Sequence, residues 1–136
     1  MSLKSPPLRG RRGKTDRVQK TRADGTWTEA SFWGFIRSGL RSMSRRWPPR
    51  RNALTAARRH YRGENKRQKW EFLCSACEGW FKATEVQVDH IEPVGSLLSW
   101  DDVAGFAKRL FVEKEGLRVL CQKCHDKRKE EPNAEH

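Results

Sequence analysis

The sequence lacks any apolar run approaching the roughly 18 residues that a membrane-spanning helix needs. It also lacks an apolar segment after its basic start, as a secretory signal would have. These absences predict a soluble protein of the cytoplasm. Apolar residues are few overall, since 35% of the 136 residues are hydrophobic and 34% are charged. A chain of this length makes about one domain, so a thin core is expected.

Acidic residues are rare in the first half of the chain. Residues 1–70 contain 20 Lys and Arg against 4 Asp and Glu, whereas residues 71–136 contain 9 against 13. The net charge of +12 favours a polyanionic partner such as nucleic acid. The uneven distribution predicts a part that contacts phosphates, joined to a part that holds cations. A merely solubilising basic tail is the alternative.

Composition divides the chain into four predicted segments. Residues 1–25 are rich in Arg, Pro and Gly and almost without large apolar residues, which predicts a disordered basic tail. Residues 26–69 are predicted to be a helical basic region. Residues 70–131 contain the cysteines and the candidate chemistry, and residues 132–136 are predicted to be a flexible C-terminus.

The first predicted helix covers residues 26–47. Thr26 and Glu29 have the spacing of a capping box, and apolar residues recur at helical spacing. Proline lacks the amide donor, so Pro48 and Pro49 are expected to end the helix. The stripe expected to be buried consists of Phe32, Phe35, Ile36, Leu40 and Met43.

A second, weaker helix is predicted in residues 50–63, with Gly63 as its C-terminal stop. Arginine is dense along both helices, and few acids balance it. This density favours contacts with nucleic-acid phosphates over a merely solvated surface. The arginines assigned to these contacts are Arg37, Arg41, Arg45, Arg50, Arg51, Arg58 and Arg59.

Cysteine is scarce, and all four residues fall into two C-x2-C pairs. Cys74 and Cys77 follow a strand-like segment, and Cys121 and Cys124 follow another. Without a secretory signal, two such pairs favour one tetrahedral four-thiolate zinc site over disulfides. Four protein ligands leave no open position for catalysis, so this zinc is expected to be structural and to stabilise a small module directly.

An α+β fold is expected around these pairs. Ser99 and Asp102 have the spacing of a capping box. The buried stripe of the helix that they begin is expected to be Val103, Phe106, Ala107 and Leu110. The predicted elements are a strand at 84–91, a helix at 99–111, a strand at 116–121 and a helix at 125–131.

Two ionisable residues, Asp89 and His90, interrupt the apolar strand at 84–91. Ionisable groups in such a position need a charged partner or a metal. Consecutive residues of a strand face opposite ways, so these two side chains can serve one site in different roles only if the backbone turns there. Pro93 and Gly95 place a loop nearby.

The segments VDHIEPV and GLRVLCQKCHDKRK resemble the HNH endonuclease family. The zinc-knuckle members of that family share the motif order C-x2-C, D-H, C-x2-C-H. The resemblance covers about residues 70–131 and implies a ββα-metal module built around the four-cysteine zinc site. More loosely, FIRSGLRSMSRRWPPR and GSLLSWDDVAGFAKRLF resemble small HNH proteins of tailed bacteriophages.

The resemblance assigns roles to particular residues. The family's general base falls on His90, and imidazole suits this role because it titrates near neutral pH. The ligands of one catalytic divalent metal (Mg²⁺ or Mn²⁺, with Ni²⁺ and Zn²⁺ as further family metals) fall on Asp89 and His125. Arg128 lies where the family often has a lysine, and a phosphate contact and simple solvation are both open for it.

The activity implied is hydrolysis of phosphodiester bonds in double-stranded DNA, by nicking or by cutting both strands. A phage origin would place the protein in the bacterial host cytoplasm, in homing or beside a DNA-packaging terminase. The oligomeric state and the target sequence are left open.

One position departs from the family pattern. The Asn that normally ties down the loop of the general base is replaced by Gly116. Either another group makes that bond, or substrate orders the loop, or the centre is weak or inactive. A non-catalytic, zinc-dependent DNA-binding protein on a degenerate HNH scaffold is therefore the alternative function, and an RNA-binding zinc protein is a third.

Overall fold

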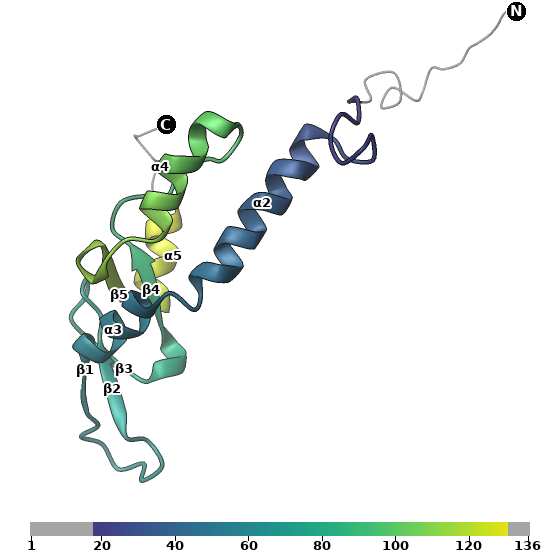
Figure 1. The fold of residues 1–136 in the computed structure, drawn as a ribbon. Coiled ribbons are helices and arrows are strands. Elements are labelled where there is room, and N and C mark those ends of the chain that lie inside the picture. Colours follow the sequence, from purple (N-terminus) through teal and green to yellow (C-terminus); the bar gives the residue numbers. More distant parts are fainter. Residues whose placement is uncertain (1–17, 131–136) are drawn as a thin grey trace, which may run out of the picture. The chain divides into compact units, whose positions relative to one another are not determined.

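The computed structural model describes residues 18–130 (Figure 1). The chain divides into two compact units, of which the first ends at Ser38 and the second begins at Gly39. The predicted helical region 26–69 is thus divided between the units. Most of the predicted basic tail, and the predicted C-terminus 132–136, lie outside the described residues. None of the helices in residues 18–130 has the length and apolarity required to cross a bilayer.

Helix α2 (Glu29–Ser44) begins at a threonine cap. The Thr28 hydroxyl accepts a hydrogen bond from the backbone N–H of Ser31 at 3.1 Å, which satisfies one of the unpaired donors of the first turn. The capping box predicted for Thr26 is therefore wrong. Glu29, its expected partner, instead pairs with Arg22 from the turn that precedes the helix.

The buried face of α2 differs from the predicted stripe. Phe35 and Met43 are 60% and 50% exposed, whereas Trp33 is 3% exposed and donates its ring N–H to Glu29. Helical spacing identifies one apolar face, but which part of that face is covered depends on the packing partners. The prediction that Phe35 and Met43 are buried is therefore wrong.

The two prolines begin a helix as well as following one. Helix α3 (Pro48–Ala57) has proline in its first turn, where the missing N–H has no intrahelical partner in any case. Beyond Ala57 the second predicted helix is wrong, because β1 (Arg58–His60) is a strand paired with β2 (Trp70–Leu73). Gly63 lies in the loop between these strands and ends no helix.

Two small antiparallel sheets follow. One has the order β1–β2–β3, with β3 at Trp80–Phe81. The other pairs β4 (Val86–His90) with β5 (Leu117–Cys121), so that Val86 lies opposite Cys121 and His90 opposite Leu117. The remaining elements are the short 3-10 turns η2 (Ala83–Glu85) and η3 (Lys114–Gly116) and the helices α4 (Trp100–Leu110) and α5 (Gln122–Glu130).

The core of the second unit joins the two sheets. Phe72 of β2, Val86 of β4 and Val119 of β5 form one buried cluster, against which Leu54 and Ala57 of α3 pack. Helix α5 contacts both β4 and β5 (Figure 1). Residues 18–130 therefore have a mixed α+β fold with four helices and two small sheets.

Two helix starts differ from the sequence-based expectation. Ser99 caps α4 without a side-chain hydrogen bond, and Asp102 accepts instead from the backbone N–H of Leu98 at 2.8 Å, so the predicted capping box is wrong. Of the stripe expected to be buried in α4, Phe106 and Leu110 are buried, as predicted. Helix α5 begins at Gln122, three residues before the predicted start, and so contains Cys124 as well as His125.

Candidate functional site

The four cysteines converge on one point in the second unit. Cys74 and Cys77 lie on the turn after β2, Cys121 is the last residue of β5, and Cys124 lies in the first turn of α5. Their sulfur atoms all lie within 4.8 Å of one another. Within residues 18–130, this is the one group of three or more His, Cys, Asp or Glu side chains close enough to share a metal ion.

Backbone hydrogen bonds shape the first cysteine pair. The N–H of Cys74 donates to the carbonyl of Gly79, and the N–H of Glu78 donates back to the carbonyl of Cys74, each at 2.9 Å. Glu78 takes a positive φ of 62°, which closes the turn. The N–H of Ser75 donates to the carbonyl of Val119 at 2.9 Å, so the knuckle is fixed to β5, the strand that carries Cys121.

The thiols influence one another's ionisation. Burial alone would raise the pKa of the Cys74 thiol, but backbone N–H groups directed at its sulfur lower that pKa to about 6. Hydrogen bonding to Cys121 and burial raise the pKa of the Cys124 thiol to about 12. One thiolate therefore forms readily, while full ionisation of the cluster requires a cation that stabilises all four charges.

The sulfur spacing fits a tetrahedral metal better than a disulfide. Cys77 Sγ lies 3.9 Å from Cys121 Sγ. A disulfide requires about 2.05 Å, whereas two thiolates on a tetrahedral zinc with bonds of about 2.3 Å lie roughly 3.8 Å apart. All four cysteines are free, so the cluster could bind a structural metal such as zinc.

Asp89 faces α5. It lies opposite Arg118 across the β4–β5 pair, at 3.7 Å from Arg118 Nη2, and Arg128 of α5 donates Nη1–H to its Oδ2 at 2.7 Å. Both guanidinium contacts use Oδ2. Oδ1 is thereby left for a further ligand. Side-chain exposure of 18% for Asp89 means that such a ligand would be partly screened from water.

His125 presents an unsatisfied nitrogen on the same side of α5. It precedes Arg128 by three residues, which puts the two side chains on one helix face. Its side chain is 18% exposed, and its Nδ1 is buried without a hydrogen-bond partner among the described residues. Buried polar atoms normally have a partner. A nitrogen of this kind is suited to ligate a cation or to bind water.

His90 points to the opposite face of β4. Regular pairing continues through His90 and Leu117, so the strand does not turn between Asp89 and His90. His90 Nε2 lies 2.9 Å from the carbonyl oxygen of Leu110. A carbonyl can only accept, so Nε2 carries the proton, and Nδ1 of the neutral ring is left as a proton acceptor.

The loop after β4 is held at three points. The N–H of Ile91 donates to the carbonyl of Gly116 at 2.9 Å. Arg128 Nη2–H donates to the carbonyl of Ile91 at 3.0 Å, and Arg109 Nε–H donates to the carbonyl of Val94 at 2.6 Å. These bonds secure the loop that adjoins His90.

The structure also accounts for the small residue at position 116. A Cβ added to Gly116 would lie 3.0 Å from both Cβ and Cγ2 of Val112, which is closer than side chains normally approach. The space that an Asn side chain would need is therefore filled by Val112. Gly116 contributes its backbone carbonyl to the loop in place of a side-chain amide.

The arginines predicted to contact nucleic acid fall into two groups. Arg59 and Arg128 form ion pairs within the chain, with Glu71 at 2.6 Å and Asp89 at 2.7 Å. Burial and the neighbouring Arg45 lower the pKa of the half-buried Arg50, and Asp89 partly offsets this, so the field of Asp89 reaches α3. The exposed members are Arg41, Arg45, Arg51 and Arg58, and Arg37 is half-buried.

Two residues at the candidate site escaped the sequence-based predictions. Arg118 stands opposite Asp89, and Arg109 secures the loop after β4. Alternation in the strand at 116–121 would have placed Arg118 on the face of Asp89 once the register was known. No comparable signal marks Arg109, since its bond to a backbone carbonyl depends on the path of the loop.

Comparison with protein-family models, with curated proteins and with solved structures gives no significant match.

Proposed function

We propose that this chain is a metal-dependent DNA endonuclease of the HNH type, in which β4, β5 and α5 form the ββα-metal module. The observation that carries the proposal is the direction of Asp89 toward the face of α5 that contains His125 and Arg128. In this arrangement of β4, β5 and α5, the two expected metal ligands, Asp89 and His125, would lie on one side of the strand pair.

Asp89 Oδ1 and His125 Nδ1 are the atoms proposed to hold the catalytic divalent metal. The fit rests on His125 Nδ1, which is buried without a hydrogen bond among the described residues and has Asp126 Oδ1 only at 3.9 Å, and on the engagement of Asp89 through Oδ2. When bound, a divalent cation would polarise the scissile phosphate and stabilise the leaving oxygen. Oxygen and imidazole ligands suit magnesium, manganese, nickel or zinc.

His90 is proposed to take the proton from the attacking water. The carbonyl of Leu110 fixes the tautomer in which Nδ1 is the acceptor, so the ring is prepared for the role of base. The turn that the sequence led us to expect between Asp89 and His90 is absent, and their side chains face opposite ways. Base and metal ligands could therefore share one substrate only at the end of β4, where the strand stops at His90.

Cations surround Asp89 and suit a phosphate substrate. Arg118 and Arg128 lie within 4 Å of its carboxylate, and Arg50 lies within its electrostatic range. Guanidinium groups bind phosphate oxygens through paired N–H donors. A DNA phosphate at Asp89 would therefore meet positive charge from α3, β5 and α5.

The four-cysteine cluster is proposed to bind zinc in a structural role. Its position ties the end of β2 to the end of β5 and the start of α5, the elements that carry or adjoin the candidate nuclease residues. The phage setting and a packaging partner stay predictions of the resemblance.

Cleavage of supercoiled plasmid tests the proposal. The zinc-loaded protein should convert plasmid to nicked or linear form with magnesium, manganese or nickel, and His90→Ala should lower the rate by about 10²–10⁴, the usual contribution of a general base. His60→Ala removes an exposed imidazole of β1, outside the candidate nuclease residues, and serves as the matched control. Equal activity of His90→Ala and the parent, or no conversion in any metal, would contradict the nuclease assignment.

One observation favours a second candidate, the non-catalytic DNA-binding protein. Arg128 and Arg118 already neutralise Asp89, as expected where an ancestral metal ligand has become part of an ion pair. This candidate predicts retention of plasmid in a gel without any cleavage. It also predicts that His90→Ala binds DNA as tightly as the parent.

A further inference from the structure

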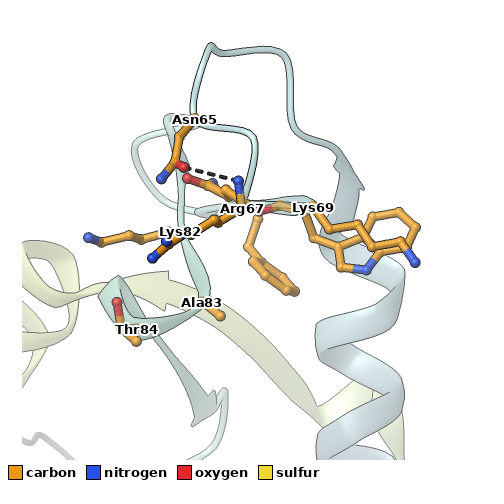
Figure 2. Close-up of a pocket in the computed structure, with 9 residues that line it drawn as sticks. Asn65, Arg67, Lys69, Lys82, Ala83 and Thr84 are labelled. Atoms are coloured by element: carbon orange, nitrogen blue, oxygen red, sulfur yellow. Dashed lines mark hydrogen bonds between the residues drawn. The ribbon is translucent and has the colours of Figure 1, made fainter.

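A basic hollow lies outside the candidate nuclease site, between the loop that joins β1 to β2 and the turn η2. Its volume is about 340 Å³. Arg67 and Lys69 of the loop, and Lys82 and Thr84 beside η2, are among the residues that line it, although most of its exposed lining is apolar. In Figure 2 the side chains of Arg67 and Lys82 extend toward the same side of the hollow.

Positive charge is concentrated in the hairpin that forms one wall. Residues 58–70 contain six Lys and Arg against a single Glu. Two nearby carboxylates already have partners, since Glu71 pairs with Arg59 and Glu85 accepts from the backbone N–H of Lys82 at 3.1 Å. Within residues 18–130, no ion pair includes Arg67, Lys69 or Lys82.

The loop is organised by its own hydrogen bonds. The N–H of Arg67 donates to the Asn65 side chain at 3.0 Å (Figure 2), and the N–H of Tyr61 donates to the carbonyl of Lys69 at 2.9 Å. Gln68 Nε2 donates to the carbonyl of Trp70 at 3.0 Å. An ordered loop lowers the entropy cost of holding Arg67 against a ligand.

The aromatic ring at the hollow is already occupied by partners from β1. His60 stacks on Trp70 with ring centroids 4.4 Å apart, and Arg58 Cζ lies 3.9 Å from the centroid of the same ring. A nucleobase stacking on Trp70 would have to displace one of these partners. An anion bound by Arg67 and Lys82 would displace neither.

We propose that this hollow binds a backbone phosphate of double-stranded DNA, through Arg67 and Lys82, at a distance from the cleaved bond. The inference rests on the proposed function for its choice of DNA as the partner. The hollow adjoins the start of β4, and Asp89 lies near the end of that five-residue strand. Val86 at the start of this strand and Asp89 are three residues apart, which at about 3.3 Å per residue is roughly 10 Å, or about three base pairs of duplex.

Such a contact positions the duplex without reading its sequence. Removing both cations should weaken binding alike on unrelated duplexes, by roughly tenfold at low salt. It should also reduce the slope of log K against log salt by about 1, the contribution of one phosphate. Sequence preference, if the protein has any, should not change.

The test uses the full chain with zinc bound and with His90→Ala, which keeps the duplex intact. Fluorescence anisotropy at several salt concentrations compares this parent with Arg67→Gln/Lys82→Gln. The matched control is Lys108→Gln/Lys114→Gln, which removes two exposed charges of α4 and η3. The charge-conserving pair Arg67→Lys/Lys82→Arg should restore affinity and slope, and thermal melting checks that all variants fold.

A tenfold loss and a reduced salt slope in the hollow variant alone would support the site. Equal losses in the hollow and control variants, or no loss in either, would overturn it while leaving the nuclease proposal intact. A loss seen on duplex RNA but not on DNA would also overturn it. A parent that binds no DNA would defeat both this inference and the proposed function.

Discussion

The four-cysteine cluster and the Asp89 site differ in how far each is assembled without a metal. The four sulfur atoms already lie within 4.8 Å of one another, and backbone hydrogen bonds hold the first knuckle in shape. Asp89, by contrast, is paired with two arginines, and His90 faces the other side of β4. His125 Nδ1 makes no hydrogen bond among the described residues. A structural metal site needs its ligands in place, whereas the proposed substrate site at Asp89 would need groups that stay available.

The largest expected effect comes from removing one thiolate of the cluster. Structural zinc binds with an apparent free energy of about 10–16 kcal/mol at pH 7, which is comparable to the whole stability of a domain. Cys74→Ser should therefore lose zinc and unfold or aggregate, because the buried Cys74 also anchors the knuckle. Zinc content and thermal melting measure both effects.

Ser75→Ala is the matched control for that variant, since Ser75 is exposed and contributes its backbone N–H to the structure. It should melt as the parent does. A normal melt of Cys74→Ser would show that the cluster does not hold the fold together.

Acid should release the metal from the cluster. The pKa of Cys74 is lowered to about 6 and that of Cys124 is raised to about 12, so at neutral pH zinc must displace protons from most of the thiols. A lowered pKa in the folded chain gives stability that is present at alkaline pH and is lost as pH falls. Zinc release followed by a chromogenic chelator should increase as the pH falls from about 8 to about 5, together with a fall in melting temperature.

A melting temperature that stays constant from pH 8 to pH 5 would contradict this linkage. The Asp89 site provides the contrast, because its ion pairs join a carboxylate to guanidinium groups that keep their charge throughout this range.

Placing Asn at position 116, as in the HNH family that the sequence resembles, should disturb the Asp89 region. Gly116→Asn puts a side chain against Val112, where even a Cβ would lie at 3.0 Å, so a loss of about 1–3 kcal/mol is expected from overpacking. Val112→Ala in the same chain should recover part of this loss. Urea unfolding of the two single variants and the double variant gives their coupling energy.

Additive effects in that cycle would show that Val112 is not what excludes a side chain at position 116. Unchanged stability of Gly116→Asn would lead to the same conclusion.

The smallest expected effect on stability comes from Arg128→Gln. Arg128 joins α5 both to Asp89 and to the carbonyl of Ile91, but its side chain is 23% exposed, so solvent screening limits the loss to about 1 kcal/mol. Hydrogen exchange at Ile91 should accelerate more than that of the cysteine knuckle. Lys127→Gln, an exposed neighbour on the same helix, is the control. Identical exchange rates at Ile91 in the two variants would show that Arg128 does not hold the loop after β4.

The sequence predicted the cysteine cluster because ligand spacing is local and chemically distinctive. Two C-x2-C pairs leave few ways to arrange four thiols, and the strands that carry Asp89 and Cys121 were visible as apolar runs. The strand β1 was missed because Arg58, Arg59 and His60 have little β preference of their own. Their conformation comes from pairing with β2, which is a tertiary effect.

The contacts around Asp89 could not be predicted from the sequence. For Arg128 the sequence leaves a phosphate contact and simple solvation open, whereas the side chain binds an aspartate 39 positions away, and nothing local in the chain encodes that pairing. The sequence alone shows Gly116 where the HNH family that it resembles has Asn. Only the structure shows that Val112 fills its space and that the Gly116 carbonyl holds Ile91.

Metal counting tests the contrast between the two regions most directly. The zinc-loaded protein should bind one further Mn²⁺, measured by calorimetry in the presence of a short DNA duplex. His125→Ala should lose this ion while keeping its zinc and its melting temperature, since His125 Nδ1 makes no hydrogen bond among the described residues and lies 3.9 Å from its exposed neighbour Asp126. Absence of a second ion in the parent, or loss of zinc together with manganese in His125→Ala, would contradict two separate centres.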